Sequence, residues 1–201
     1  MFDYMNQNRA HFWSRRAADQ RALVFVGDSL TGGWSTLAKD FPQVKTANRG
    51  IGGDVTRGML FRFGEDVLDL NPIAVVMLAG SADLSALQAP SVALRNISAM
   101  AGMLKKRLPT TPLVLCTVPP RLNAAAPVNP ARIAELNEGI KQFASSRDGV
   151  VVVDLHTALS DSEGNPVPAY FAPDLLHLSP AGYRVWKAEL EPSLRRIGIL
   201  T

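Results

Sequence analysis

The 201-residue sequence is poor in the features on which several protein classes depend. It contains one cysteine, so no internal disulfide can form, and Cys116, which lies in an apolar run, is expected to be a buried core residue. No run of about 18 apolar residues occurs, which excludes a membrane-spanning helix. Neither a disulfide scaffold nor an integral membrane protein is therefore expected.

The charge also lacks a strong excess of one sign. Twenty-one basic and 18 acidic residues give a net charge of +3, and the densest basic groups are Lys105-Lys106-Arg107 and Arg195-Arg196. Both groups fall at the ends of predicted helices, where cations interact favourably with the helix dipole on a solvated face. We therefore expect no nucleic-acid partner.

The N-terminal segment has no basic start followed by an uninterrupted apolar block, so it does not resemble a secretory signal. A cytoplasmic location is expected by default, although a secreted parent with its leader removed would look the same. The amphipathic stretch around Phe12 and Trp13 could dock on its own domain or on a partner subunit. A homo-oligomer therefore remains open.

A hydrophobic content of 47% over this length is enough for one domain, residues 1–201, with a sizeable core. Short apolar runs predict five strands, at 22–26, 44–47, 73–78, 113–118 and 150–155. Helical periodicity predicts helices at 55–70, with Asp54 as N-cap, and at 91–108, 130–143 and 180–197. Strands that alternate with helices predict parallel pairing and a three-layer α/β/α sandwich.

Three polar motifs follow the first three predicted strands: Gly27-Asp28-Ser29-Leu30, Gly50-Ile51-Gly52-Gly53-Asp54 and Gly80-Ser81-Ala82-Asp83. Active sites of open parallel sheets lie beyond the carboxyl ends of the strands. A serine at such a turn exposes its hydroxyl, and the glycines allow backbone N–H groups to face a developing oxyanion. A phosphate-binding loop is a weaker interpretation, because no dinucleotide fingerprint or Walker Lys-Ser/Thr pair is present.

A fourth motif, Asp174-Leu175-Leu176-His177, supplies the groups that a serine nucleophile requires. The imidazole of His177 can take the hydroxyl proton of Ser29, and Asp174, three residues before it, can orient the ring. His11 lies in a polar leader, and His156 follows the fifth predicted strand in a segment without a matching carboxylate, so both are interpreted as structural or solvated.

These four blocks, in this order and spacing, resemble the SGNH or GDSL-type hydrolases over nearly the whole chain. Residues 48–57 and 171–183 look most like the platelet-activating-factor acetylhydrolase catalytic-subunit branch and its bacterial esterase relatives. The resemblance implies a flavodoxin-like fold with a five-stranded parallel sheet and a serine esterase mechanism without metal or organic cofactor. It assigns Ser29 as nucleophile, His177 as general base, Asp174 as the orienting acid, and the N–H groups of Ser29 and Gly53 as oxyanion donors.

The family's third oxyanion donor is an Asn side chain, and Ala82 stands at that position. Loss of one such donor typically lowers turnover roughly 100- to 1,000-fold, so weakened hydrolysis is expected. Ser81 could compensate, or the alanine could have been introduced to disable catalysis. The alternative is a non-catalytic module that binds esters or carbohydrates, and a nucleotide-binding protein of flavodoxin-like fold is a more remote one.

The resemblance implies short acyl esters as small-molecule substrates, acetyl esters first and lysophospholipid-like esters second. The residues expected to contact substrate are Asp28, Leu30, Arg121 and Phe171. For Arg121, a solvated loop position is the alternative. The Pro-rich loop at 119–130 and the segment at 170–173 are expected to line the site.

Overall fold

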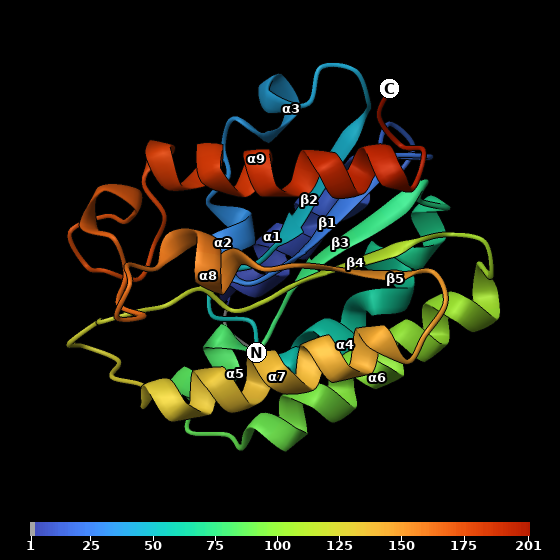
Figure 1. Ribbon diagram of the computed structural model, residues 1–201. Coiled ribbons are helices and arrows are strands. Elements are labelled where there is room, and N and C mark those ends of the chain that lie inside the picture. Colours follow the sequence, from blue (N-terminus) through green and yellow to red (C-terminus); the bar gives the residue numbers. More distant parts are fainter. Residues whose placement is uncertain (1–2) are drawn as a thin grey trace.

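The computed structural model describes residues 3–201 and contains a five-stranded, all-parallel sheet (Figure 1). The strand order is β2-β1-β3-β4-β5, so the chain starts near the middle of the sheet and moves outward in both directions. The strands are β1 (Leu23–Gly27), β2 (Thr46–Gly50), β3 (Ala74–Leu78), β4 (Leu113–Cys116) and β5 (Val150–Val153). This arrangement confirms the predicted fold class.

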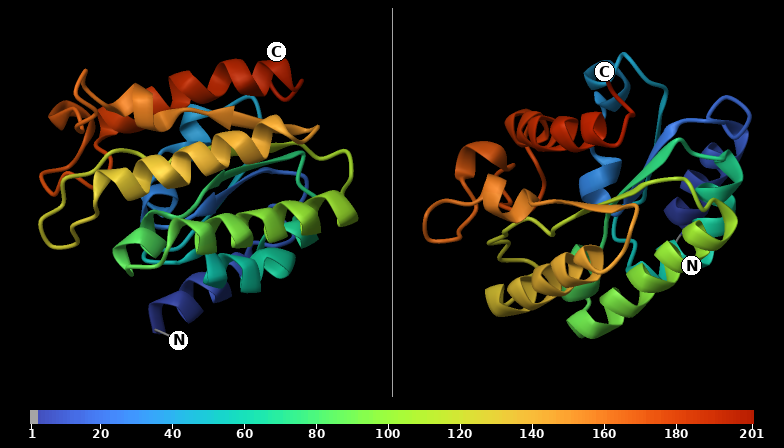
Figure 2. Two further views of the ribbon diagram at one scale, coloured as in Figure 1. Left: turned by 60° about the horizontal axis from the view of Figure 1, so that its bottom comes forward. Right: turned by 45° about the vertical axis from the view of Figure 1, so that its right-hand side comes forward.

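Helices cover both faces of the sheet and give three layers (Figure 2). One face carries α4 (Thr56–Asp66), the 3-10 turn η1 (Leu68–Leu70), α5 (Ser81–Ser85), α6 (Pro90–Arg107) and α7 (Pro130–Ser145). The other carries α2 (Ser29–Gly32), α3 (Leu37–Asp40), α8 (Leu155–Leu159), the 3-10 turn η2 (Pro168–Tyr170) and α9 (Pro180–Arg196). Successive strand residues point to opposite faces, so Val24 and Val26 pack in one core and Leu23 and Phe25 in the other.

The predicted long helices end within a few residues of the observed ones, but strand β2 begins two residues later and reaches three residues further than 44–47. Asn48 and Arg49 are compatible with a strand because each side chain has a partner. Asn48 donates from Nδ2 to the Thr31 carbonyl at 2.8 Å, and buried Arg49 forms an ion pair with Asp19 at 2.9 Å. These partners come from other parts of the chain, so local hydrophobicity could not reveal them.

Helix α4 is capped by a residue that lies far away in the sequence. The prediction that Asp54 is its N-cap is wrong, because the Asp54 carboxylate forms an ion pair with Arg62 at 2.8 Å. Instead, the buried carboxylate of Asp83 accepts hydrogen bonds from the Thr56 N–H at 2.8 Å and the Thr56 hydroxyl at 2.6 Å. Asp83 therefore joins the turn after β3 to the start of α4.

The N-terminal segment forms a helix, α1 (Asp3–Ser14), that packs against α4 of its own chain (Figure 2). Phe12 is buried there, with the guanidinium of Arg49 4.8 Å from its ring centroid, and Arg9 forms an ion pair with Asp66 at 3.4 Å. Trp13 points outward and is 61% exposed. The part of this segment that the structure describes therefore docks on its own domain.

The two basic clusters occupy the last turns of α6 and α9, as expected. Cys116 is buried on β4, also as expected, and burial raises the pKa of its thiol to about 12. Within residues 3–201, no helix combines the length and apolar character needed to cross a membrane.

We expect Asp83→Ala to lower the free energy of unfolding by about 3 kcal/mol, because it leaves two buried donors of Thr56 without their charged acceptor. Asp161→Ala is the matched control: Asp161 also accepts two backbone N–H bonds, but in an exposed loop where water can replace it. Urea unfolding should show a loss below about 1 kcal/mol for this control. Equal losses in the two variants would contradict the role of Asp83 in holding the start of α4.

Candidate active site

The serine of the first motif is the first residue of α2, directly beyond the carboxyl end of β1 (Figure 1). Asp28 is the N-cap of this short helix, and its Oδ1 accepts the Leu30 N–H at 3.0 Å. This cap fixes the turn so that Ser29 is partly exposed while Asp28 and Leu30 are buried. The local structure therefore presents one hydroxyl at the edge of the sheet.

The end of β2 supports the same turn from the side. A Cβ atom on Gly50 would lie 2.1 Å from the backbone nitrogen of Gly32, so only glycine allows β2 to approach α2 so closely. Asn48 also bonds to this region, because it donates to Thr31 and accepts the Gly50 N–H at 2.9 Å. The Asn48-Arg49-Gly50 segment thus fixes the position of the serine turn.

Ser29, His177 and Asp174 form a continuous hydrogen-bonded chain. His177 Nε2 lies 3.1 Å from Ser29 Oγ, and His177 Nδ1 lies 2.5 Å from Asp174 Oδ2. The second oxygen of Asp174 accepts the N–H groups of Leu176 and His177, each at 3.0 Å. The structure therefore brings together the three residues that the sequence separates by 145 positions, from Ser29 to Asp174.

The carboxylate of this chain is held in its charged form. Partial burial opposes the charge, but the hydrogen bonds from the His177 ring and from the backbone N–H groups of His177 and Leu176 lower the pKa of Asp174 to about 2. An ionised Asp174 fixes the proton of the neutral ring on Nδ1, which leaves Nε2 as an acceptor facing Ser29. The arrangement can therefore remove the hydroxyl proton.

The loop that carries Asp174 and His177 is fixed at both ends and at its tip. Phe171 and Leu178 form an antiparallel bridge, and the Ala172 N–H donates to the His177 carbonyl at 2.7 Å. Leu175, between the two catalytic candidates, has φ of 50°, a strained conformation for a side chain of this type. Such strain persists only where surrounding contacts impose it.

The Pro-rich loop supplies some of those contacts, as expected for a segment at the edge of the site. The Leu122 N–H donates to the Leu175 carbonyl at 3.1 Å, and Asn123 Nδ2 donates to the Asp174 carbonyl at 2.9 Å. Neither residue belongs to one of the four motifs, so the sequence carries no signal for this role. Leu122, 52% exposed beside the triad, also offers an apolar surface.

A tight turn of residues 51–54 lies against the serine. The Asp54 N–H donates to the Ile51 carbonyl at 3.1 Å, and Gly53 has φ of 71°. A Cβ atom on Gly52 would lie 3.8 Å from Ser29 Cβ, which places this turn in contact distance of the nucleophile candidate. Ala82 is partly exposed at the start of α5, after the carboxyl end of β3.

The GDSL-like Lipase/Acylhydrolase family model matches residues 25–185, a range that contains every one of these elements. The chain belongs to this family. Its sequence motifs, its fold and the placement of Ser29 after β1 are all consistent with membership in this family of lipases and acylhydrolases. No match is found among curated proteins.

Several solved structures share the fold. A candidate acylhydrolase from Bacteroides fragilis has a TM-score of 0.86 and 26% identity, with 98% of this chain and 99% of that chain covered. A GDSL-like lipase from Bacteroides thetaiotaomicron has a TM-score of 0.82 and 25% identity, with 93% and 97% covered. An acetyl-xylooligosaccharide esterase mutant from Geobacillus stearmophilus, at 21% identity and a TM-score of 0.68, shares the fold over 88% and 93% of the two chains.

The four predicted substrate contacts are not on the surface of the site. Each of the four is 5% exposed or less: Asp28, Leu30, Arg121 and Phe171. This prediction is therefore corrected, because the four side chains are buried beneath the exposed residues of the site. Leu30 and Phe171 are core residues of the α9 face, while Asp28 caps α2. In the sequence Asp28 and Leu30 flank Ser29, but neighbours along a tight turn point to opposite sides, so only Ser29 is partly exposed.

Arg121 is neither solvated nor at the substrate surface. Its Nη1 donates to the Ser85 hydroxyl at 2.7 Å and, at 3.3 Å, to the Ser81 hydroxyl, and its Nη2 donates to the Ala126 carbonyl at 2.7 Å. Arg121 therefore ties the Pro-rich loop to α5. Because Ser81 is buried against this guanidinium, its hydroxyl is directed to Arg121.

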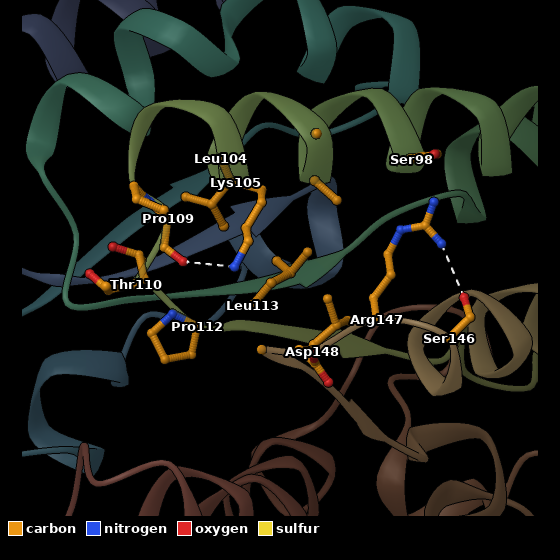
Figure 3. A pocket seen from close by; sticks show the side chains of 15 residues that line it. Ser98, Leu104, Lys105, Pro109, Thr110, Pro112, Leu113, Ser146, Arg147 and Asp148 are labelled. Carbon is orange, nitrogen blue, oxygen red and sulfur yellow. Dashed lines mark hydrogen bonds between the residues drawn. The ribbon is translucent and has the colours of Figure 1, made fainter.

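A cavity lies at the opposite end of the strands from Ser29. Its volume is about 560 Å³, and it opens beside the first residues of β4 and β5, Leu113 and Val150 (Figure 3). Its basic side chains bond locally: Lys105 donates to the Pro109 carbonyl and Arg147 to the Ser146 hydroxyl. Neither Ser29 nor His177 lines this cavity.

No group of three or more His, Cys, Asp or Glu side chains within residues 3–201 is arranged to hold a metal ion.

Asp28 makes stability depend on pH in a defined direction. Burial raises its pKa from 3.8 to about 6, although the N–H groups of Leu30 and Ala82 oppose the shift. Because the native state binds this proton more tightly than the unfolded state, the stabilisation present below pH 3.8 is lost as the pH rises through 6.

Asp28→Asn removes this titration while keeping a side-chain oxygen for the Leu30 cap. Between pH 4.5 and pH 7, the free energy of unfolding of the wild type should fall by about 2 kcal/mol relative to that of the variant. Urea unfolding at the two pH values measures this difference. A difference that does not change with pH would contradict the raised pKa of Asp28.

Proposed function

We propose that this chain is a serine esterase that hydrolyses short-chain, acetyl-type carboxylic esters through an acyl-enzyme formed on Ser29. The observation that carries the proposal is the hydrogen-bonded chain from Ser29 Oγ through His177 to the ionised Asp174. Its place beyond the carboxyl end of β1, in a member of an acylhydrolase family, supports the same assignment.

In the first half of the reaction, Ser29 Oγ attacks the ester carbonyl carbon while His177 Nε2 accepts the hydroxyl proton. Asp174 holds the ring in the required orientation and stabilises the imidazolium that forms. The tetrahedral intermediate then collapses: the bond from carbon to the alkoxy oxygen breaks, and His177 returns its proton to the departing alcohol. The acyl group remains on Ser29.

In the second half, His177 takes a proton from water, whose oxygen attacks the acyl carbon. The second tetrahedral intermediate expels Ser29 Oγ, which recovers its proton from His177. The carboxylic acid is released and the starting protonation of the site is restored. The side chain of His177 is 46% exposed, so water reaches it without any rearrangement of the fold.

The oxyanion formed in each half-reaction is assigned to the backbone N–H groups of Ser29 and Gly53. Support comes from the start of α2 at Ser29 and from the contact between the 51–54 turn and Ser29 Cβ. Ala82 supplies no side-chain donor, and Ser81, whose hydroxyl oxygen accepts a hydrogen bond from Arg121, is buried. We therefore propose that turnover is limited by oxyanion stabilisation.

The substrate assignment follows from the openness of the site. The Asp174 and His177 side chains are 38% and 46% exposed, so a large alcohol portion can extend into solvent. Leu122 provides only a small apolar surface for the acyl group. These features favour short acyl groups, and the similar fold of an acetyl-xylooligosaccharide esterase agrees with an acetyl ester.

Ser29→Ala should reduce hydrolysis of 4-nitrophenyl acetate at least about 1,000-fold, because no nucleophile remains to form the acyl-enzyme. Ser35→Ala, which changes an exposed serine in the following turn, is the matched control and should keep the wild-type rate. Release of 4-nitrophenol measures both. Wild-type turnover in Ser29→Ala would overturn the proposed mechanism.

Ala82→Asn should raise turnover by about 100-fold or more, because it restores an amide donor for the oxyanion. Ala86→Asn, at the exposed end of the same short helix, introduces the same side chain away from the site and should have no effect. An unchanged rate in Ala82→Asn would show that another group already fills the role. Saturable ester binding without turnover in this variant would instead favour the binding module.

A further inference from the structure

The peptide group between Gly52 and Gly53 is held by a residue outside all four motifs. Tyr4, on the first turn of α1, donates its hydroxyl proton to the Gly52 carbonyl at 2.7 Å, across 48 residues of sequence. This carbonyl belongs to the same peptide group as the Gly53 N–H. Resting on the proposed function, we propose that Tyr4 is a positioning residue that sets the orientation of the Gly53 oxyanion donor.

The geometry of the turn explains why this contact matters. In the turn closed by the Ile51–Asp54 hydrogen bond, Gly52 and Gly53 occupy the two central positions. The two common forms of such a turn differ by a flip of the peptide group between these residues, and a positive φ at the second, as in Gly53, marks one of them. A flip would exchange the directions of the Gly52 carbonyl and the Gly53 N–H.

The two glycines leave this flip with little intrinsic resistance. Glycine has no Cβ atom and populates positive and negative φ with similar ease, so neither residue by itself favours one form of the turn. Packing also supports the turn weakly on the α1 side, where Ile51, Asp54 and Val55 line a cavity of about 280 Å³ together with Met5 of α1. A discrete hydrogen bond to the flipping carbonyl therefore has a large influence on the population of each form.

The Tyr4 hydroxyl lies on the turn itself. A Cβ atom on Gly53 would be 3.2 Å from the Tyr4 oxygen, while one on Gly52 would be 3.8 Å from Ser29 Cβ. The turn is thus enclosed between the nucleophile and the phenol. A donor on the carbonyl also polarises the amide group and strengthens the hydrogen bond that its N–H can donate.

Helix α1 is anchored well enough to position a phenol. Phe12 is buried near its end, with the guanidinium groups of Arg49 and Arg62 at 4.8 and 5.9 Å from its ring centroid. In the middle of the helix, Arg9 forms ion pairs with Glu65 and Asp66 of α4. Tyr4 therefore projects from a docked helix.

The test compares Tyr4→Phe with the wild type, each also in the Ala82→Asn background. Loss of the hydroxyl should lower kcat for 4-nitrophenyl acetate about 5- to 10-fold with KM unchanged, because the donor acts on the transition state. Stoichiometric phosphonylation of Ser29 by a 4-nitrophenyl alkylphosphonate, whose phosphoryl oxygen enters the same hole, should slow by a similar factor. A helix that only stabilised the fold would leave both rates unchanged below the unfolding temperature.

Glu65→Gln is the matched control, because it weakens an exposed ion pair of α1 without touching Tyr4. It should retain the wild-type kcat and phosphonylation rate. If Ser29→Ala is inactive and Tyr4→Phe reacts as fast as the wild type in both assays, the positioning role is overturned and the proposed function stands. If Ser29→Ala turns over like the wild type, both are overturned.

Discussion

The buried guanidinium of Arg62 makes the interactions that hold the parts of this site together. It forms an ion pair with Asp54, at the end of the glycine turn, and donates to the Gly27 carbonyl at 3.3 Å, at the start of the serine turn. It also reaches Asp66 at 3.5 Å, and Phe12 of α1 packs beside it. Burial raises the pKa of Asp54 and Asp66, while the charge of Arg62 opposes that shift. A buried ion network of this kind adds geometric definition more than net stability.

Around Arg62, the segments that follow the carboxyl ends of three strands lie together. β1 provides Ser29, β2 provides the 51–54 turn, and β3 leads through Ala82 to Asp83, which clamps the start of α4. The fourth contribution, the loop with Asp174 and His177, comes from the far end of the chain and is fixed by its own bridge and by the Pro-rich loop. The serine side of the site is therefore held by buried contacts, while the side chains of the histidine side are exposed.

The sequence alone was sufficient for the parallel sheet, the four long helices and the triad candidates, because these depend on periodicity and on motifs at strand ends. It failed where a side chain finds its partner across the fold. The local pattern favours Asp54 as a helix cap, but Asp54 pairs with Arg62. It favours Arg121 as a substrate contact or a solvated loop residue, but its guanidinium bonds to Ser81, Ser85 and Ala126. Tyr4 lies in a segment with no motif, so only the structure relates it to Gly52.

If Ser29 is the nucleophile, it carries the acyl group during turnover, and this group can be trapped. The protein is mixed with 4-nitrophenyl acetate, quenched in acid during turnover, digested and analysed by mass spectrometry. We expect one acetyl group on the peptide that contains Ser29, and none on that peptide in Ser29→Ala. An acetyl group confined to another residue during turnover would contradict the assignment of Ser29. So would an unmodified Ser29 under conditions where the acyl-enzyme forms faster than it is hydrolysed.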